Sequence, residues 1–165
     1  MQDPEPVKTA ESKKVSSIVV QRRVEFSETD MAGILHFTNL FKYMELAEAE
    51  LYEKIGSSLF ETVPGEVVGW PRVRVNAEFH APLRFRDLVE IHLHVKELKI
   101  RAIEFAFWFF RQDKEGPTHI ATGSMTTLCV TLDPKTGSMV SRSLPEHLER
   151  SLVASEPLLR PYKKM

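Results

Sequence analysis

The hydrophobic positions of the first half of this chain follow a helical period. Between Thr38 and Gly56, apolar residues recur at spacings of three or four, at Leu40, Met44, Ala47, Leu51 and Ile55. This spacing places them along one face of an α-helix of roughly four turns or more. Thr38 or Asn39 is expected to cap the helix, because a short polar side chain can accept a hydrogen bond from a free N–H of the first turn. Gly56 is expected to end the helix, because glycine is common directly after the last helical residue.

The second half follows a period of two, which is typical of β-strands. Apolar and polar residues alternate over 72–79 and 89–96, and a third run covers 103–110. A fourth run, 119–132, is long and almost uncharged, and the segment Asp133 to Gly137 that ends it predicts a turn. An earlier strand is expected over 15–26, a loop over 57–70, a short returning strand over 138–140, and a short helix over 145–152.

One long helix and four or five strands predict an α+β domain, in which an antiparallel sheet of about five strands wraps around one central helix. The third strand has apolar residues on both of its faces, including Phe107 on one and Trp108 on the other. A single sheet on one helix would leave its second face in water. We therefore expect a second sheet or subunit, and so a dimer or a larger assembly.

Composition narrows the class of protein. The 165 residues suit one domain over 16–153, with a disordered tail over 1–15 and a polar tail over 154–165. The 22 basic and 23 acidic residues nearly balance, which argues against a nucleic-acid or membrane partner. The single cysteine, Cys129, excludes an intrachain disulfide and is expected to be buried and inert. The chain lacks an apolar run of the ~20 residues that span a bilayer and lacks a secretory signal, so a cytoplasmic protein is expected.

The candidate chemistry lies just ahead of the long helix, at the loop carboxylate of Asp30. A helix start offers unpaired N–H groups and a partial positive charge, which can hold a developing oxyanion. A carboxylate beside such a site can serve acyl chemistry as a nucleophile or a base. Taken alone, the segment Glu28-Thr29-Asp30 would more simply be a solvated turn.

The surrounding residues resemble a known family. The segment Asp30-Met-Ala-Gly33-Ile34-Leu35-His36-Phe37-Thr38-Asn39, followed by Tyr43-Met-Glu45-Leu-Ala47, is similar to the start of hotdog-fold acyl-CoA thioesterases of the 4-hydroxybenzoyl-CoA thioesterase type. The segments Phe79-His-Ala-Pro82-Leu and Asp87-Leu-Val-Glu-Ile and the Leu144-Pro145 step extend the resemblance, which covers about residues 16–153.

The resemblance implies an antiparallel sheet curled around one helix, assembled as a homodimer or homotetramer with the active site between subunits. The substrate would be an acyl-CoA thioester, and neither a metal nor a bound cofactor would be needed. Asp30 takes the place of the catalytic carboxylate, and the backbone N–H of Phe37 takes that of the oxyanion donor. Gly33, His36 and Asn39 are expected to contact the substrate; a packed or hydrogen-bonded His36 is an equal alternative.

The chain departs from the family pattern at two helix positions. Leu40 stands where Tyr is common, and Glu48 stands where Arg is common. A second hotdog branch uses a helical carboxylate preceded by His-Gly-Gly, which is missing here, and Glu45 is the reserve candidate for that role. These departures leave open a domain that binds acyl-CoA or another apolar ligand without hydrolysing it. A dehydratase of the same fold is not supported, because this sequence has no loop that pairs an Asp with a nearby His in that family's pattern.

Other polar residues have simpler explanations. Glu45 and Glu48 are expected to be solvated or to pair along the helix. His92 and His94 share a strand face, but with no third ligand evident, an exposed face explains them better than a metal site does. Five arginines could bind coenzyme A phosphates, and most of them are expected to be surface charges: Arg72, Arg74, Arg84, Arg86 and Arg101.

Overall fold

A computed structural model describes residues 14–59, 62–63, 66–133 and 135–155 of the chain. Most of the two predicted tails, 1–13 and 156–165, lies outside these residues. The first half holds one strand, a 3-10 turn, the long helix and two short strands: β1 (Ser17–Arg23), η1 (Phe26–Glu28), α1 (Thr38–Lys54), β2 (Thr62–Val63) and β3 (Glu66–Gly69). The second half holds the long strands and a short helix: β4 (Arg72–Phe79), β5 (Leu88–Leu98), β6 (Ala102–Asp113), β7 (Gly116–Leu128), β8 (Val130–Leu132), β9 (Met139–Ser141) and α2 (Glu146–Ser151).

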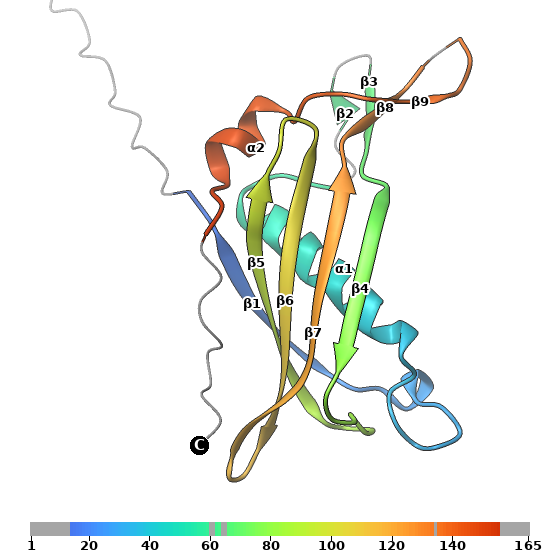
Figure 1. Ribbon diagram of the computed structural model, residues 1–165, viewed down its shortest axis with the longest axis vertical. Coiled ribbons are helices and arrows are strands. Elements are labelled where there is room, and N and C mark those ends of the chain that lie inside the picture. The colour runs from blue at the N-terminus through green and yellow to red at the C-terminus, as the bar shows by residue number, and fades with distance from the viewer. Residues whose placement is uncertain (1–13, 60–61, 64–65, 134, 156–165) are drawn as a thin grey trace, which may run out of the picture.

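The main sheet has five antiparallel strands in the order β1-β5-β6-β7-β4, and α1 lies across one of its faces (Figure 1). This confirms the expected α+β architecture. The strands β5, β6 and β7 follow one another in sequence and pair as neighbours, so the centre of the sheet is a meander. The two edge strands, β1 and β4, come from before and after α1. The loop that leads into α1 lies at one end of the sheet (Figure 1).

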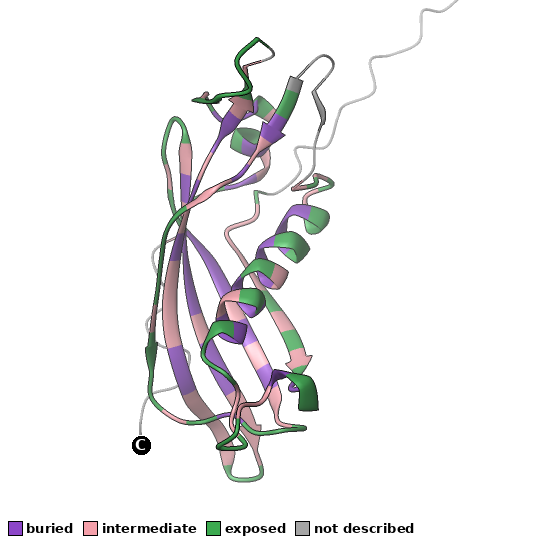
Figure 2. Cartoon of the chain, turned by 90° about the vertical axis from the view of Figure 1, so that its right-hand side faces the viewer, coloured by how far each residue is buried: buried purple, intermediate pink, exposed green. Residues whose placement is uncertain are grey.

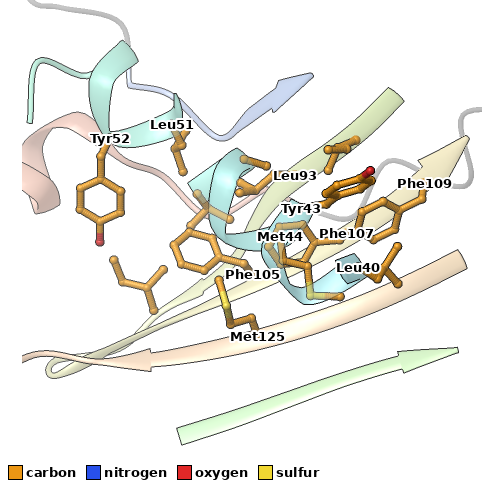
Figure 3. Packing of buried hydrophobic residues seen from close by; sticks show 14 of the residues in the cluster. Leu40, Tyr43, Met44, Leu51, Tyr52, Leu93, Phe105, Phe107, Phe109 and Met125 are labelled. Carbon is orange, nitrogen blue, oxygen red and sulfur yellow. The ribbon is translucent and has the colours of Figure 1, made fainter. Parts of the chain in front are cut away.

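The hydrophobic core lies between α1 and the sheet, where one side of the helix is buried along its length (Figure 2). Leu40, Met44 and Leu51 of the expected apolar stripe are buried, and they face aromatic side chains of β6, including Phe105 and Phe107 (Figure 3). The approach is close, because a Cβ added to Gly123 of β7 would overlap the Met44 side chain. Gly56 has φ +71° directly after the helix, a conformation that suits glycine.

The second face of β6 is also partly covered, as its sequence predicted. Phe110 and Ala106, which point away from α1, are both buried. His94 of the neighbouring β5 is buried too and packs edge-on against Trp108, and His92 is half-buried. The expectation that His92 and His94 lie on an exposed strand face is therefore wrong. Burial lowers the pKa of His94 and favours the neutral imidazole.

Two expectations about the strands need correction. The segment 57–70, expected to be a loop, contains β2 and β3, which join β8 and β9 in a second sheet of four strands with the order β2-β3-β8-β9. The expected single strand over 119–132 is interrupted at Cys129, whose N–H donates to the Arg101 carbonyl (2.8 Å). The chain thereby leaves the main sheet as β7 and enters the small sheet as β8. Cys129 itself is buried, as predicted.

Candidate active site

The loop that carries Asp30 is a compact turn closed by its own backbone. The Asp30 N–H donates to the Ile34 carbonyl (2.9 Å), and the Gly33 N–H donates back to the Asp30 carbonyl (2.9 Å). Gly33 has φ +72°, a left-handed conformation that other residues adopt only with strain. The Leu35 N–H then donates to the Leu83 carbonyl (2.8 Å), which ties the loop to the segment after β4. The position of Asp30 is thus fixed by the fold.

The Asp30 carboxylate is held through one of its two oxygens. Oδ1 accepts hydrogen bonds from the Ala32 N–H (2.8 Å) and from the Ile34 N–H (3.4 Å). Among the described residues, Oδ2 has no donor. This arrangement orients the carboxylate and leaves one oxygen available for a reacting molecule.

Asp30 lines a cleft of about 470 Å³ between the loop, the start of α1 and the segment after β4. The rest of the lining is mostly apolar and comprises Ile34, Leu35, Phe37, Leu40, Phe79, His80, Ala81, Pro82, Leu83 and Ile120. An ionisable carboxylate in a largely apolar cleft of this size is typical of a small-molecule site.

The helix start lies on the same cleft. Phe37 is the N-cap of α1, and within the described part of the chain its N–H has no acceptor. The prediction that Thr38 or Asn39 caps the helix is wrong, because other partners use both side chains. The Thr38 hydroxyl lies 2.8 Å from Nδ1 of His36, and the Asn39 amide donates to the Glu28 carbonyl (2.8 Å). A free N–H of the first turn therefore shares the cleft with a carboxylate.

A buried acid that the sequence did not single out lies behind this loop. Glu28 is 8% exposed, and its carboxylate accepts hydrogen bonds from the Tyr43 hydroxyl (2.6 Å), an Arg22 guanidinium nitrogen (3.0 Å) and the Glu25 N–H (2.8 Å). Burial would raise the pKa of Glu28, but these donors outweigh it and hold the pKa below its ordinary value.

The backbone of Glu28 is equally engaged. Its carbonyl accepts from the His36 N–H (2.9 Å) and from the Asn39 amide (2.8 Å). Glu28 thus joins β1, the Asp30 loop and α1, so the simpler alternative of a solvated turn over 28–30 does not hold at this residue. Asn39 and Tyr43, polar residues one helical turn apart beside the apolar stripe, were the available sequence signal.

A second buried acid lies further along α1. Glu48 is 0% exposed, and its Oε2 accepts from Arg72 of β4 at 2.6 Å, while its Oε1 has no partner. Burial raises the pKa of Glu48 to about 7, although the Arg72 guanidinium opposes the shift. The expectation that Glu48 is solvated or pairs along the helix is therefore wrong. Glu45, the reserve catalytic candidate, also pairs with Arg72 (3.1 Å) and is not part of the cleft lining around Asp30.

The histidines considered from sequence contact neighbouring side chains. The His36 ring packs against the Phe37 ring at a tilt of 31°, with ring centroids 4.7 Å apart. His92 pairs with Glu90 (3.3 Å) and packs against Phe110. Among the residues that the structure describes, no group of three or more His, Cys, Asp or Glu side chains could hold a metal ion. Nor is any described helix long and apolar enough to cross a membrane.

Comparison with known proteins points to one kind of chemistry. The family model described as thioesterase-like superfamily matches residues 24–152. A putative esterase of Aquifex aeolicus is 35% identical over 97 residues, which cover 58% of this chain and 73% of the relative. A 1,4-dihydroxy-2-naphthoyl-CoA hydrolase of a Synechococcus strain is 30% identical over 141 residues, covering 82% of this chain and 89% of the relative.

A solved structure shares the fold. A variant of 4-hydroxybenzoyl-CoA thioesterase in complex with 4-hydroxybenzoyl-CoA superposes with a TM-score of 0.74, at 21% identity, covering 83% of this chain and 99% of that one. The matched region of the family model begins at the end of β1 and ends directly after α2. It therefore contains the whole cleft, with the Asp30 loop and the start of α1.

Proposed function

Because the chain belongs to the thioesterase-like superfamily, has the hotdog fold and is a thioester hydrolase, we propose that it hydrolyses an acyl-CoA thioester in the cleft beside Asp30. The observation that carries the proposal is the pairing of a carboxylate with a free helix N–H on one apolar cleft. In this reaction a water molecule adds its oxygen to the carbonyl carbon, the C–S bond breaks, and a free acid and a thiol leave.

Asp30 is proposed as the reacting carboxylate. Its Oδ2 either attacks the carbonyl carbon, to give an anhydride that water then opens, or takes a proton from the attacking water. The two donors on Oδ1 keep the side chain in one orientation for either role. Neither role needs a metal or a bound cofactor, so we propose that the reaction uses none.

The Phe37 N–H is proposed as the oxyanion donor. As the carbonyl carbon becomes tetrahedral, its oxygen gains negative charge, and a fixed N–H at a helix start stabilises that charge without reorganising. Loss of one such donor commonly raises the barrier by about 3–4 kcal/mol. The apolar lining strengthens the effect, because electrostatic interactions are less screened away from water.

The lining of the cleft also indicates which kind of acyl group it can bind. Phe37, Leu40, Phe79 and Ile120 supply aromatic and aliphatic surface around the carboxylate. We propose an apolar acyl group. Two of the proteins named above, the 1,4-dihydroxy-2-naphthoyl-CoA hydrolase and the 4-hydroxybenzoyl-CoA thioesterase, are named for aroyl thioesters, so aromatic acyl groups come first among the candidates. His36, Gly33 and Asn39 would then act through the position of the loop and of the helix start.

The proposed active form is a homodimer, which can pair further into a homotetramer. The edge strand β4 bonds only to β7 in the described sheet, and its side chains Val73 and Phe79 are 58% and 52% exposed. An unpaired edge with an apolar row is a site for pairing with a second chain. Since Phe79 also lines the cleft, a partner along β4 would cover the active site.

Asp30→Asn tests this function, because asparagine keeps the size of the side chain and removes its charge. Turnover of the preferred substrate from a panel of acyl-CoAs, followed as thiol release, should fall by two or more orders of magnitude, roughly the span of acid–base catalysis. Asp133→Asn, in the surface turn before β9, is the matched control and should keep full activity. Circular dichroism and the oligomeric state should be unchanged in both variants.

Two results would contradict the proposal. Full activity of the Asp30→Asn variant would remove Asp30 from the mechanism. If every acyl-CoA of the panel were bound by the native chain and recovered intact after long incubation, the domain would be a binding module for apolar acyl thioesters.

A further inference from the structure

One wall of the cleft belongs to the turn between β4 and β5, residues 80–87, which we call the wall turn. Arg111 of β6 lies beside it and donates to its Pro82 carbonyl (2.9 Å). This arginine was not among those considered from sequence. We propose that Arg111 is a positioning residue, which fixes the wall turn and, through the wall turn, holds the Asp30 loop in place for hydrolysis. The inference rests on the proposed function.

The wall turn is hydrogen-bonded directly to the Asp30 loop. The Leu83 carbonyl accepts from the Leu35 N–H (2.8 Å), and both residues line the cleft. Pro82, whose carbonyl Arg111 binds, is the residue before Leu83. A movement of the wall turn would therefore carry the Asp30 loop with it. Displacement of a reacting group by about 1 Å can slow a reaction by about a hundredfold.

The wall turn contains a strained residue and so depends on contacts from outside it. Arg86 has φ +72°, the only positive value of a non-glycine residue in the described part of the chain. Such a conformation persists only where the surrounding structure over-determines it. From the side of β1, the Arg23 guanidinium donates to the Arg86 carbonyl (2.8 Å), and the Arg86 N–H donates to the Val24 carbonyl (3.0 Å). These bonds hold the second half of the wall turn.

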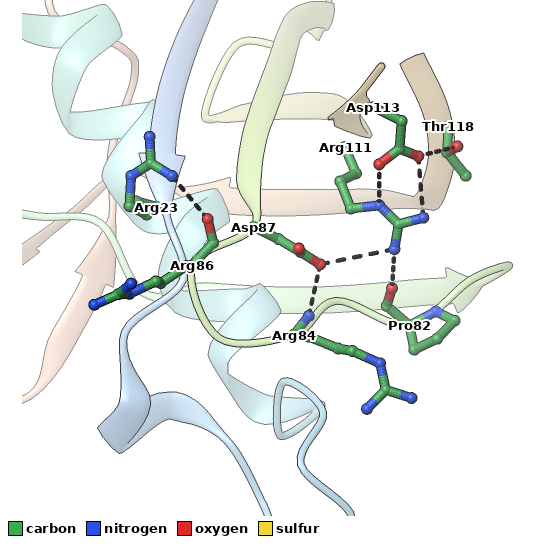
Figure 4. Close-up of polar contacts among 8 residues, drawn as sticks. All are labelled: Arg23, Pro82, Arg84, Arg86, Asp87, Arg111, Asp113 and Thr118. Carbon is green, nitrogen blue, oxygen red and sulfur yellow. Dashed lines mark hydrogen bonds and ion pairs between the residues drawn. The ribbon is translucent and has the colours of Figure 1, made fainter. Parts of the chain in front are cut away.

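Arg111 holds the wall turn from another side, opposite Arg23 (Figure 4). Besides donating to the Pro82 carbonyl, its guanidinium lies 3.7 Å from the Asp87 carboxylate. That carboxylate in turn accepts from the Arg84 N–H (2.7 Å). One side chain of β6 thus contacts both the part of the wall turn that lines the cleft and the residue directly before β5.

Arg111 is itself held by the hairpin of β6 and β7 (Figure 4). Its Nε and Nη2 donate to the two oxygens of Asp113 (2.7 and 3.0 Å), and the Thr118 hydroxyl donates to the same carboxylate (2.5 Å). The Arg111 donors, followed by Thr118, hold the pKa of Asp113 below its ordinary value, which keeps the pair charged. Because a paired contact of this kind fixes the plane of the guanidinium, Arg111 meets the wall turn in one orientation.

Kinetics of Arg111→Gln separate positioning from two other roles. An arginine that only stabilises the fold would leave kcat unchanged while the chain stays folded, and one that binds substrate would raise KM. We expect kcat for an acyl-CoA that the native chain hydrolyses to fall by roughly five- to thirtyfold, with KM changed less than about threefold. Arg111→Lys keeps the charge and a donor and should recover part of the loss. Circular dichroism should show both variants folded at the assay temperature.

Hydrogen exchange of backbone amides, followed by NMR, tests the inference without turnover. In Arg111→Gln the Leu35 N–H should exchange faster, because its acceptor Leu83 belongs to the loosened wall turn. The acceleration should be roughly tenfold greater than that of amides at the centre of β5, since a local opening does not require the sheet to unfold.

Lys96→Gln is the matched control, because Lys96 pairs with Glu104 between β5 and β6 and is not part of the cleft lining. Its kcat should stay within about twofold of the native value, as for an exposed ion pair, and Leu35 exchange should be native. Native kcat in Arg111→Gln, an equal loss in the control, a rise in KM alone, or native Leu35 exchange would overturn the inference. If the native chain hydrolyses no acyl-CoA, the proposed function fails, whereas the exchange rates still show whether Arg111 holds the loop.

Discussion

At the scale of single residues, two buried carboxylates near α1 have opposite pKa shifts for a physical reason. Glu28 has three donors on its carboxylate and is held ionised, whereas Glu48 has one donor and an oxygen with no partner. A buried charge without enough donors is disfavoured, so the proton is retained to higher pH. Exposure alone therefore does not decide the charge of an acid; the number of donors around it does.

Glu48 should make stability depend on pH. Its pKa of about 7 in the folded chain lies above the ordinary value of 4.5, so between these pH values the folded state binds more protons than the unfolded state. Folding stability should accordingly fall as pH rises through this window, by up to roughly 3 kcal/mol. Urea unfolding at pH 5 and pH 8 measures the difference in the free energy of unfolding.

Glu48→Gln is the matched variant, because it cannot titrate. The native chain should lose more stability than this variant between the two pH values. Equal losses in both proteins would show that Glu48 is ionised throughout the range.

At the scale of elements, Glu28 sets how α1 and the Asp30 loop meet. Its side chain binds Tyr43 of α1 and Arg22 of β1, and its carbonyl binds the loop at His36. Glu28→Gln should keep the fold but loosen these ties, and a small displacement of a reacting group can reduce rate by about a hundredfold. We expect kcat to fall by roughly ten- to a hundredfold with little change in KM.

Glu25→Gln provides the comparison for this prediction. Glu25 also pairs with Arg22, but its side chain is mostly exposed, so its loss should change kcat less than about twofold. A Glu28→Gln enzyme with native kcat, or with a higher KM alone, would mean that the hydrogen bonds of the Glu28 side chain do not position Asp30.

Periodicity predicted most elements because it reports which face of each element is buried. The stripe from Leu40 to Leu51 and the alternation in β5 both mark contacts with the core. Asp30 and Phe37 came from the family motif, and the structure brings them to one cleft. Glu28 and Glu48 were missed, since their partners Tyr43 and Arg72 come from tertiary contacts that no local pattern contains. The helix cap was wrong because the Thr38 side chain bonds His36 and the Asn39 side chain bonds the Glu28 carbonyl.

At the scale of the whole molecule, the exposed edge of β4 should control assembly. Val75→Lys places a charge on this edge and should prevent strand pairing, because a buried charge without a partner is strongly unfavourable. Light scattering after gel filtration should show a dimer or tetramer for the native chain and a monomer for the variant. Thioesterase activity should fall with dissociation, as the cleft beside Phe79 loses its cover.

Val19→Lys is the control on the opposite edge strand, β1, where Val19 is also exposed. It should keep the native assembly and activity. A native chain that is monomeric and fully active at all concentrations would contradict the proposed active form.

The strand order also determines when β1 and α1 can pack while the chain is being synthesised. β1 ends at Arg23, but its only partner in the sheet, β5, begins at Leu88. At about 5–20 residues per second, the ribosome needs roughly 3–13 s to make the residues between them. Through that interval β1 and the apolar face of α1 have no sheet to pack on. The nascent chain therefore exposes the Asp30 loop and α1 first, and these elements can pack only when the β5–β7 meander has been made.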